Sequence, residues 1–204
     1  MNTPTAKRRT DPEKAQHRCN QVLEAAAVCF ARSGFHGASM SEISKQAGMS
    51  AGHIYNYFDG KDAIIAVFVD REAEYVTDLL RDLASRDDPL QAMLDDAENT
   101  VNEKLTPQPW HVPLEMYAEA SRNPAVAAKL SANSSRARAS LREMVKDGRE
   151  RRKLPVDDVL LDARIDTMIS FFHGLPIRAM LHNDMNRVAL ADSYRVVMRA
   201  LMMT

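Results

Sequence analysis

The stretch VLEAAAVCFARSGFHGASMSEISKQAGMSAGHIYNYFDGKDAII, residues 22–65, decides the fold of this chain. In its first part Val22, Ala26 and Phe30 recur every four residues, which is the spacing of a single buried face on a helix. Gly34 follows and is expected to end that helix. The stretch therefore begins with an amphipathic helix that packs against its neighbours.

Two short helices joined by a tight turn come next. Ser39-Met40-Ser41-Glu42 has the Ser-x-x-Glu pattern of a capping box, so a helix begins there, and Gly48 ends it after about two turns. Ser50 supplies the cap of a further helix, Ala51 to Phe58. This arrangement predicts a helix-turn-helix, whose second helix enters the major groove of DNA.

The leading turn of that second helix consists of Ser50, Ala51, Gly52 and His53. Its small residues let the backbone approach DNA, and the exposed amides at a helix start favour phosphate oxygens. Tyr55 and Tyr57 lie near the other end, where they can reach a phosphate or a thymine methyl, and Lys61 is a further candidate phosphate ligand. The alternatives are that the tyrosines are half-buried packing residues and that His53 is a solvated surface histidine.

Residues 22–65 resemble the DNA-binding domain of the tetracycline-repressor (TetR) family of transcription regulators. The matching features occur in the family's order: the Ala-Ala-x-x-x-Phe stripe, the Gly-Phe after it, the Ser-rich start of the second helix, Ile43, Ala47-Gly48, Ser50-x-Gly52, Ile54-Tyr55-x-Tyr57-Phe58 and Lys61. The resemblance covers about a fifth of the chain. It implies a DNA-binding regulator whose C-terminal body binds a ligand and forms a dimer.

The resemblance also implies roles for individual residues. Its groove-facing positions fall on Ser39, Met40, Ser41, Ala51, Gly52 and His53, and its phosphate-contacting positions fall on Tyr55, Tyr57 and Lys61. The sequence departs from the family at Asp59-Gly60, where the family often has a neutral or basic residue followed by Ser or Asn. Ser41 is shorter than the base-reading side chain of some relatives. Base preference is therefore expected to depend on His53 and the basic N-terminal arm.

The rest of the chain also has helical periodicity. The whole chain holds only seven glycines in 204 residues and no Asn-Gly or Asp-Gly hairpin between alternating strands. We expect an all-α fold of about nine helices and no strand. The domains would be a flexible basic arm at 1–10, a three-helix helix-turn-helix DNA-binding domain at 11–60, and a helical ligand-binding and dimerisation domain at 61–204.

Composition and charge favour an intracellular protein that does not enter a membrane. Residues 1–62 hold eight Lys and Arg against six Asp and Glu, and the remaining residues hold 19 against 22. A mildly basic end on an acidic body suits docking on an anionic polymer. Cys19 and Cys29 would be about 15 Å apart on one helix, too far for a disulfide. With no signal peptide and no apolar run of about 20 residues, we expect a cytoplasmic location.

The C-terminal body carries the candidate effector site. Methionine and aromatic side chains with a few polar groups could line an apolar pocket: Met93, Trp110, His111, Met116, Tyr117, Phe171, Phe172 and His173. Core packing explains these residues equally well. The basic cluster from Arg149 to Lys153 is expected to be a solvated helix end.

The family's dimer interface would fall on the last two helices, 156–181 and 187–203. The histidines and cysteines show no metal spacing, and neither a phosphate loop nor a Gly-x-Ser-x-Gly elbow occurs, so no catalytic site, metal or cofactor is expected. We therefore expect a homodimeric repressor that a small lipophilic ligand releases from a palindromic operator in double-stranded DNA. The alternatives are a helical ligand-binding protein without DNA-regulatory activity and, third, a structural interaction module.

Overall fold

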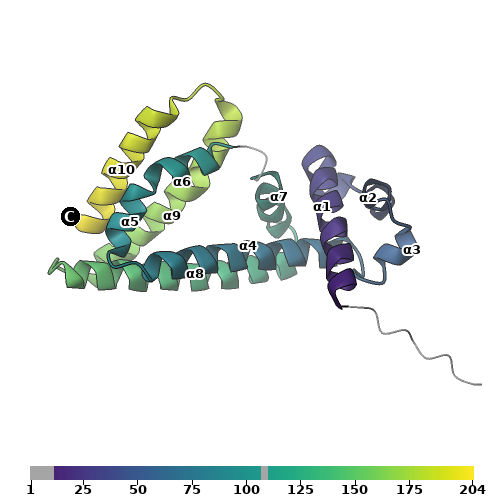
Figure 1. Cartoon of the computed structure of the whole chain (residues 1–204), viewed down its shortest axis with the longest axis horizontal. Helices are drawn as coiled ribbons and strands as arrows, with labels where there is room; N and C mark the ends of the chain where they lie inside the picture. The colour runs from purple at the N-terminus through teal and green to yellow at the C-terminus, as the bar shows by residue number, and fades with distance from the viewer. Residues whose placement is uncertain (1–11, 107–109) are drawn as a thin grey trace, which may run out of the picture. The chain divides into compact units, whose positions relative to one another are not determined.

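The computed structural model describes residues 12–106 and 110–204, so the basic arm expected at residues 1–10 lies outside the described residues. Within these ranges every regular element is a helix, which confirms the all-α class (Figure 1). The helices are α1 (Pro12–Gly37), α2 (Met40–Ala47), α3 (Ala51–Ile54), α4 (Lys61–Ala84), α5 (Pro89–Asp95), α6 (Ala97–Lys104), α7 (His111–Ala120), α8 (Pro124–Arg151), α9 (Asp158–Leu181) and α10 (Arg187–Met203).

The described ranges hold one helix more than the nine expected, because the segment after residue 89 breaks at Asp96. Asp96 is both the C-cap of α5 and the N-cap of α6. Its carboxylate makes no capping bond to a backbone amide and instead accepts a hydrogen bond from the Asn99 side chain, Nδ2, at 2.7 Å. The apolar periodicity continues across this break, which is why the sequence pattern did not reveal it.

The chain forms two compact units, and α4 contributes residues to both. The N-terminal unit ends at Phe68 and the C-terminal unit begins at Val69. In the N-terminal unit the ring of Phe30 lies edge-on to Phe35 and Phe68, with centroid distances of 5.4 and 6.1 Å. The fully buried residues of this unit include Val22, Ala26, Cys29, Ile43, Ile54, Ile64 and Ile65. The stripe that the sequence predicted on α1 is therefore core.

The core of the C-terminal unit is formed by side chains from α5, α6, α8, α9 and α10. Its fully buried members include Leu90, Leu94, Val101, Val145, Ile165, Met168 and Met198. Gly148 of α8 lies against Leu90 so closely that a Cβ at this position would be 2.6 Å from Leu90 Cγ. The two helices therefore need a residue without a side chain at this contact.

Arg149 corrects the prediction that residues 149–153 form a solvated helix end. Its guanidinium is buried and donates hydrogen bonds to the carbonyl oxygens of Pro155, Met202 and Thr204 at 2.8 to 3.2 Å. Burial lowers its pKa from the ordinary value. The acceptors lie in the turn after α8 and at the end of α10, up to 55 residues away, so helical periodicity around Arg149 could not predict them. Arg151 is exposed, as expected.

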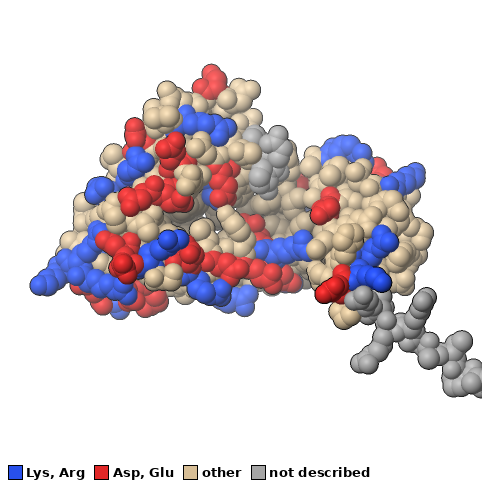
Figure 2. Space-filling view, in the orientation of Figure 1, with Lys and Arg blue, Asp and Glu red and all other residues tan. Residues whose placement is uncertain are grey.

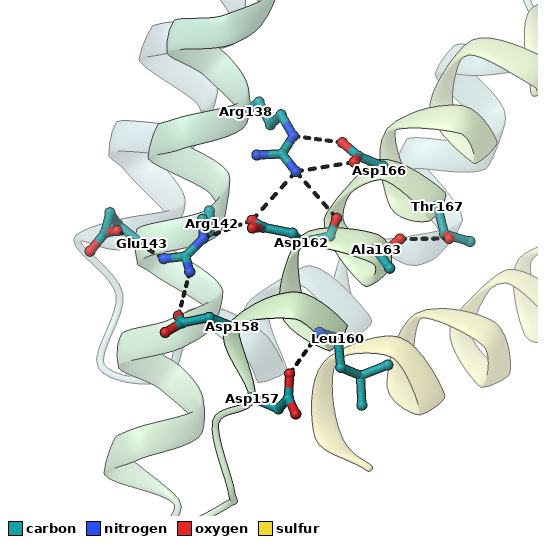
Figure 3. Close-up of polar contacts among 10 residues, drawn as sticks. All are labelled: Arg138, Arg142, Glu143, Asp157, Asp158, Leu160, Asp162, Ala163, Asp166 and Thr167. Atoms are coloured by element: carbon teal, nitrogen blue, oxygen red, sulfur yellow. Dashed lines mark hydrogen bonds and ion pairs between the residues drawn. The ribbon is translucent and has the colours of Figure 1, made fainter.

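An ion-pair ladder joins α8 to α9 (Figure 3). Asp158, Asp162 and Asp166 follow one another at four-residue intervals along one face of α9. Arg138 of α8 binds both carboxylate oxygens of Asp166, at 2.6 and 3.0 Å, and Arg142 binds Asp162 at 2.8 Å and also Asp158. These hydrogen bonds raise the pKa of both arginines and lower that of Asp166. The ladder fixes the register of α9 along α8.

Charged side chains also cover the surface of α8 and the later part of α4. Lys129 of α8 donates to Asp70 of α4 at 2.7 Å, and Figure 2 shows acidic and basic side chains interspersed along this part of the surface. No helix among the described residues is long and apolar enough to cross a membrane.

Candidate DNA interface and effector site

Helix caps fix the backbone of the candidate DNA-binding region, α2 and α3. The Ser39 hydroxyl accepts a hydrogen bond from the Glu42 amide at 3.1 Å, and the Glu42 carboxylate accepts one from the Ser39 amide at 2.8 Å. The Ser39 amide, and the Ser39 hydroxyl at 2.9 Å, both donate to the Glu42 carboxylate and hold its pKa below its ordinary value. Gly48 then has a left-handed conformation, with φ 62° and ψ 31°, and the Ser50 hydroxyl accepts from the His53 amide at 3.3 Å. The predicted capping box and tight turn are therefore present.

The candidate contact residues lie on the surface of this frame. Ser39, Ser41, Ser50, Ala51, Gly52, His53 and Tyr55 are exposed, while Met40, Tyr57 and Lys61 are half-buried. The second helix is shorter than expected, because α3 ends at Ile54 and residues 55–57 form turns. Tyr57 Oη lies 3.3 Å from His53 Nε2, so these two side chains are paired, whereas the Tyr55 side chain is 51% exposed. Most of the expected residues thus lie at the starts of α2 and α3 and in the turn after α3.

Lys61 has an additional role that the sequence did not predict. Its ammonium donates to the carbonyl oxygens of Phe35 and Ala38, each at 2.7 Å, and of His36 at 3.3 Å. It also lies over the Phe35 ring, 4.9 Å from the centroid. These carbonyls are left without helical partners where α1 ends. All three ammonium hydrogens therefore have acceptors inside the N-terminal unit, and a phosphate contact by Lys61 stays a prediction.

The candidate effector residues fall into three groups. Trp110, Tyr117, Phe172 and His173 lie near one another, and the Tyr117 hydroxyl is 3.3 Å from His173 Nε2. Met93 and Met116 are buried. Phe171 is 40% exposed, and His111 is half-buried. The structure thus brings four of the eight residues together and leaves the pocket role of all eight a prediction.

Charged residues that the sequence analysis missed complete that group of four. Lys104, at the end of α6, is buried and lies over the rings of Trp110 and Phe172, with centroid distances of 4.7 and 5.9 Å. Its ammonium binds Glu103 Oε1 at 2.9 Å, and the Tyr75 hydroxyl donates to Glu103 Oε2 at 3.0 Å. We call the full set the Lys104 cluster; it consists of Glu72, Tyr75, Glu103, Lys104, Trp110, Tyr117, Phe172 and His173.

The pKa values in the Lys104 cluster are shifted mainly by burial. Burial raises the pKa of Glu72, against the opposing effect of Lys104. Burial, and then the charge of Lys104, lower the pKa of His173 and so favour its neutral form. Burial, with the charge of Glu103 next, raises the pKa of Tyr75 to about 12. The signal in the sequence is the spacing alone: Lys104 follows Ala97 and Val101 at the interval of one helix face, although the other residues of α6 are polar.

Exposed apolar side chains mark the helices expected to form the dimer interface. On α9 and α10 they are Val159, Leu160, Phe171, Ile177, Met180, Leu181, Val188 and Val196. The exposed fractions reach 82% for Val159 and 69% for Val196. A dimer interface on α9 and α10 would bury these side chains, and their part in such an interface stays a prediction.

Two family models match this chain. The model described as "Bacterial regulatory proteins, tetR family" matches residues 22–67. The model described as "BetI-type transcriptional repressor, C-terminal" matches residues 87–204, more than half of the chain. The two matches correspond to the helix-turn-helix region and to the part of the C-terminal unit that follows α4.

Curated and solved relatives agree with these models. The HTH-type transcriptional regulator UidR of Escherichia coli strain K12 is 32% identical over 123 residues, which are 57% of this chain and 59% of UidR. The match thus spans less than two thirds of that relative. The structures of Bacillus subtilis FadR in complex with stearoyl-CoA and of a Saccharomonospora viridis transcriptional regulator in complex with choline share the fold. Both have a TM-score of 0.70 and 20% identity; they cover 90% and 91% of this chain, and 97% and 95% of theirs.

Proposed function

This chain belongs to the tetracycline-repressor (TetR) family of bacterial regulatory proteins, and we propose that it is a homodimeric repressor that a small ligand releases from a palindromic operator. The observation that carries this proposal is the exposed first turn of α3. Ser50 caps the start of α3, and Ser39 caps the start of the preceding helix, α2. Amides and small side chains at such a turn can approach base edges and phosphates closely. The protein would act in the cytoplasm, where bacterial DNA is.

On DNA, the two copies of α3 would occupy successive major grooves. Their half-site centres would lie about 34–36 Å apart, one helical turn of DNA. Ser39, Met40, Ser41, Ser50, Ala51, Gly52 and His53 would face the groove, and Tyr55 and Tyr57 would contact phosphates. Because the Lys61 ammonium is already bound to three carbonyls, a phosphate contact by Lys61 would have to replace at least one of them. His53 is then the main candidate for base preference among the exposed side chains of α3.

The dimer would form through α9 and α10. Their exposed apolar side chains would be buried by the same surface of a second copy, as in a twofold-symmetric interface. The ladder from Arg138 and Arg142 to the three aspartates of α9 would hold one of these helices in register. Two helices from each copy would make a four-helix interface.

The link between ligand and DNA would be α4. Its first residues, including Ile64 and Ile65, belong to the core of the N-terminal unit, while Glu72 and Tyr75 belong to the Lys104 cluster of the C-terminal unit. A ligand that changed the contacts of Glu72 or Tyr75 would act on the same helix that holds the helix-turn-helix. Coupling of about 1–3 kcal/mol is typical of such linked sites, and the ligand must bind the two conformations unequally.

Selection of bound duplexes from a random library, followed by affinity against salt, tests the DNA-binding proposal. We expect an inverted repeat and a steep fall of affinity with salt, because phosphate contacts release counterions. His53→Ala should change the selected bases. The same substitution at His182, exposed at the end of α9, should not, and serves as the control. A folded dimer that enriches no sequence would favour the alternative, a ligand-binding protein without DNA-regulatory activity.

A further inference from the structure

His53 and Tyr57 form a side-chain pair within the candidate DNA interface. His53 Nε2 lies 3.3 Å from the Tyr57 hydroxyl oxygen, and the centroids of the two rings are 5.5 Å apart. The next residue in each case, Ile54 and Phe58, is buried in the core of the N-terminal unit and anchors the backbone on which the pair lies. The core therefore positions both rings, while His53 itself is exposed to any ligand of this surface.

The hydrogen atoms of this pair can be counted. A tyrosine hydroxyl has one hydrogen to donate and lone pairs that accept, and a neutral imidazole donates from one ring nitrogen and accepts at the other. The contact between His53 and Tyr57 therefore has two forms. Either Tyr57 donates to Nε2 and the imidazole hydrogen is on Nδ1, or Nε2 donates to Tyr57 and Nδ1 is an acceptor. The Tyr57 hydroxyl thus decides whether Nδ1 donates or accepts.

Contact with DNA selects one of these two forms. Phosphate oxygens only accept hydrogen bonds, so a Tyr57 hydroxyl that binds a phosphate uses its one hydrogen there. Nε2 of His53 must then be the donor within the pair, and Nδ1 is left without a hydrogen. On the major-groove edge the amino groups of adenine and cytosine donate, whereas the oxygens of guanine and thymine accept. An Nδ1 acceptor therefore matches adenine and cytosine and opposes guanine and thymine.

We propose that Tyr57 is a positioning residue for base recognition: by binding a phosphate it keeps the His53 hydrogen on Nε2, and His53 Nδ1 then reads the amino group of an adenine or a cytosine in each half-site. The inference rests on the proposed function, since it names the class of base that the same regulator reads. Phosphate contacts carry no sequence information by themselves. The pair links one such contact to a contact that does carry it.

Duplex selection with the full-length protein at about pH 8, where free imidazole is neutral, tests the class of base. The parent should enrich adenine or cytosine at one position of each half-site, on the strand that His53 contacts. His53→Ala should lose the preference at that position and keep the preferences at the others. A preference for guanine or thymine on both strands is impossible at one base pair, so the strand is fixed by placing the pair on each strand in turn and removing only the amino group.

Removal of that amino group is done with purine in place of adenine, or 2-pyrimidinone in place of cytosine. The parent should bind such an operator about two- to tenfold more weakly, the range expected for one hydrogen bond. The His53→Ala protein should not distinguish the two operators beyond the change in duplex stability, which is common to both proteins. Equal sensitivity of the two proteins would overturn the proposal.

Tyr57→Phe separates a positioning role from a simple phosphate contact. Loss of a phosphate contact alone weakens binding about equally for all sequences. Without the hydroxyl the His53 hydrogen can be on either nitrogen, so the loss that the parent shows on removal of the amino group should shrink. Tyr55→Phe, which changes the other candidate phosphate ligand, is the matched control and should weaken binding without reducing that loss. A folded Tyr57→Phe protein that keeps the full parental loss contradicts the positioning role.

The imidazole hydrogen can also be located without a Tyr57 variant. Nitrogen-15 NMR of the labelled protein bound to its operator distinguishes a protonated from an unprotonated ring nitrogen, and His53→Ala identifies the His53 signals among those of the six histidines. In the complex we expect the hydrogen on Nε2 and none on Nδ1. A hydrogen on Nδ1 in the complex rejects the proposal.

Failure of the repressor and failure of the pair give different results. A folded protein that enriches no sequence rejects the repressor, and the base-reading pair with it. An enriched inverted repeat without a His53-dependent preference for an amino group rejects only the pair and leaves the repressor standing.

Discussion

The two compact units differ in how far along the chain their defining contacts reach. In the N-terminal unit the helix-turn-helix is held by caps that span three residues, Ser39 to Glu42 and Ser50 to His53. In the C-terminal unit the polar contacts that fix the helices span much longer distances. Arg149 reaches Thr204, 55 residues away, and Arg195 reaches the carbonyl of Leu94, 101 residues away. The N-terminal unit can therefore be specified by a short sequence motif, whereas the C-terminal unit depends on contacts between residues far apart in the chain.

Replacing Arg149 should have the largest effect, and it tests whether long-range contacts stabilise the C-terminal unit. Arg149→Met should lower the free energy of unfolding of the C-terminal unit by about 2–4 kcal/mol, because it removes charged hydrogen bonds and leaves carbonyl oxygens without a donor. Urea unfolding at a fixed protein concentration measures the change. Arg151→Met, two residues away on the exposed side of the same helix, should stay within about 0.5 kcal/mol. Equal losses for the two variants would mean that the buried network contributes little.

Replacing one glycine in each unit with alanine compares the packing of the two units directly. Gly148→Ala should destabilise the C-terminal unit by about 1–3 kcal/mol, because the new methyl would overlap Leu90, which is fully buried. Gly52→Ala meets no atom within 4 Å, so it should stabilise the N-terminal unit by about 0.5–1 kcal/mol.

The same pair separates stability from DNA binding. If α3 approaches DNA at its leading turn, Gly52→Ala should weaken operator binding although it stabilises the protein. Gly148→Ala should leave operator binding unchanged in the fraction that remains folded. Thermal unfolding and operator titration on the same samples measure both quantities. A Gly52→Ala protein that binds its operator as tightly as the parent would show that the backbone of this turn is not close to DNA.

Features held by local contacts could be predicted from the sequence, whereas features held by contacts between distant residues could not. The caps at Ser39 and Ser50 and the turn at Gly48 are visible in the sequence because each needs one residue type at one spacing. Lys104 and Arg149 were missed because the rings and carbonyls that hold them come from other helices. In the sequence both residues lie among other polar and charged residues, and only the fold shows that they are buried and what compensates their charges.

Lys61 is an exception within the N-terminal unit, since its acceptors are 23 to 26 residues away. Lys61→Met should lower the free energy of unfolding of this unit by about 1–2 kcal/mol, because three carbonyls at the end of α1 lose their donor. The salt dependence of operator binding should be unchanged. Tyr55→Phe should do the reverse and weaken binding without loss of stability. If Lys61→Met reduces the salt slope by about one, the lysine contacts a phosphate as the family resemblance implies.

The smallest effect is expected for the exposed ladder of the C-terminal unit. Hydrogen bonds from Arg138 hold the pKa of Asp166 below its ordinary value in the folded protein. A carboxyl with a lowered folded pKa contributes stability above its unfolded pKa of about 3.9 and loses it as the pH falls through the folded value. Asp166→Asn should therefore lower the melting temperature slightly at pH 7, and the difference from the parent should shrink towards pH 3.

Asp184→Asn, at an exposed aspartate between α9 and α10, is the matched control and should show no such pH-dependent difference. High salt should reduce the Asp166 effect as well, because more than half of that side chain is exposed to solvent. A difference that does not shrink at all between pH 7 and pH 3 could not come from the carboxylate, because part of a carboxylate's contribution is lost once the pH falls below the unfolded pKa. It would show instead that position 166 matters for packing, and that the long-range contacts of this unit depend on shape more than on charge.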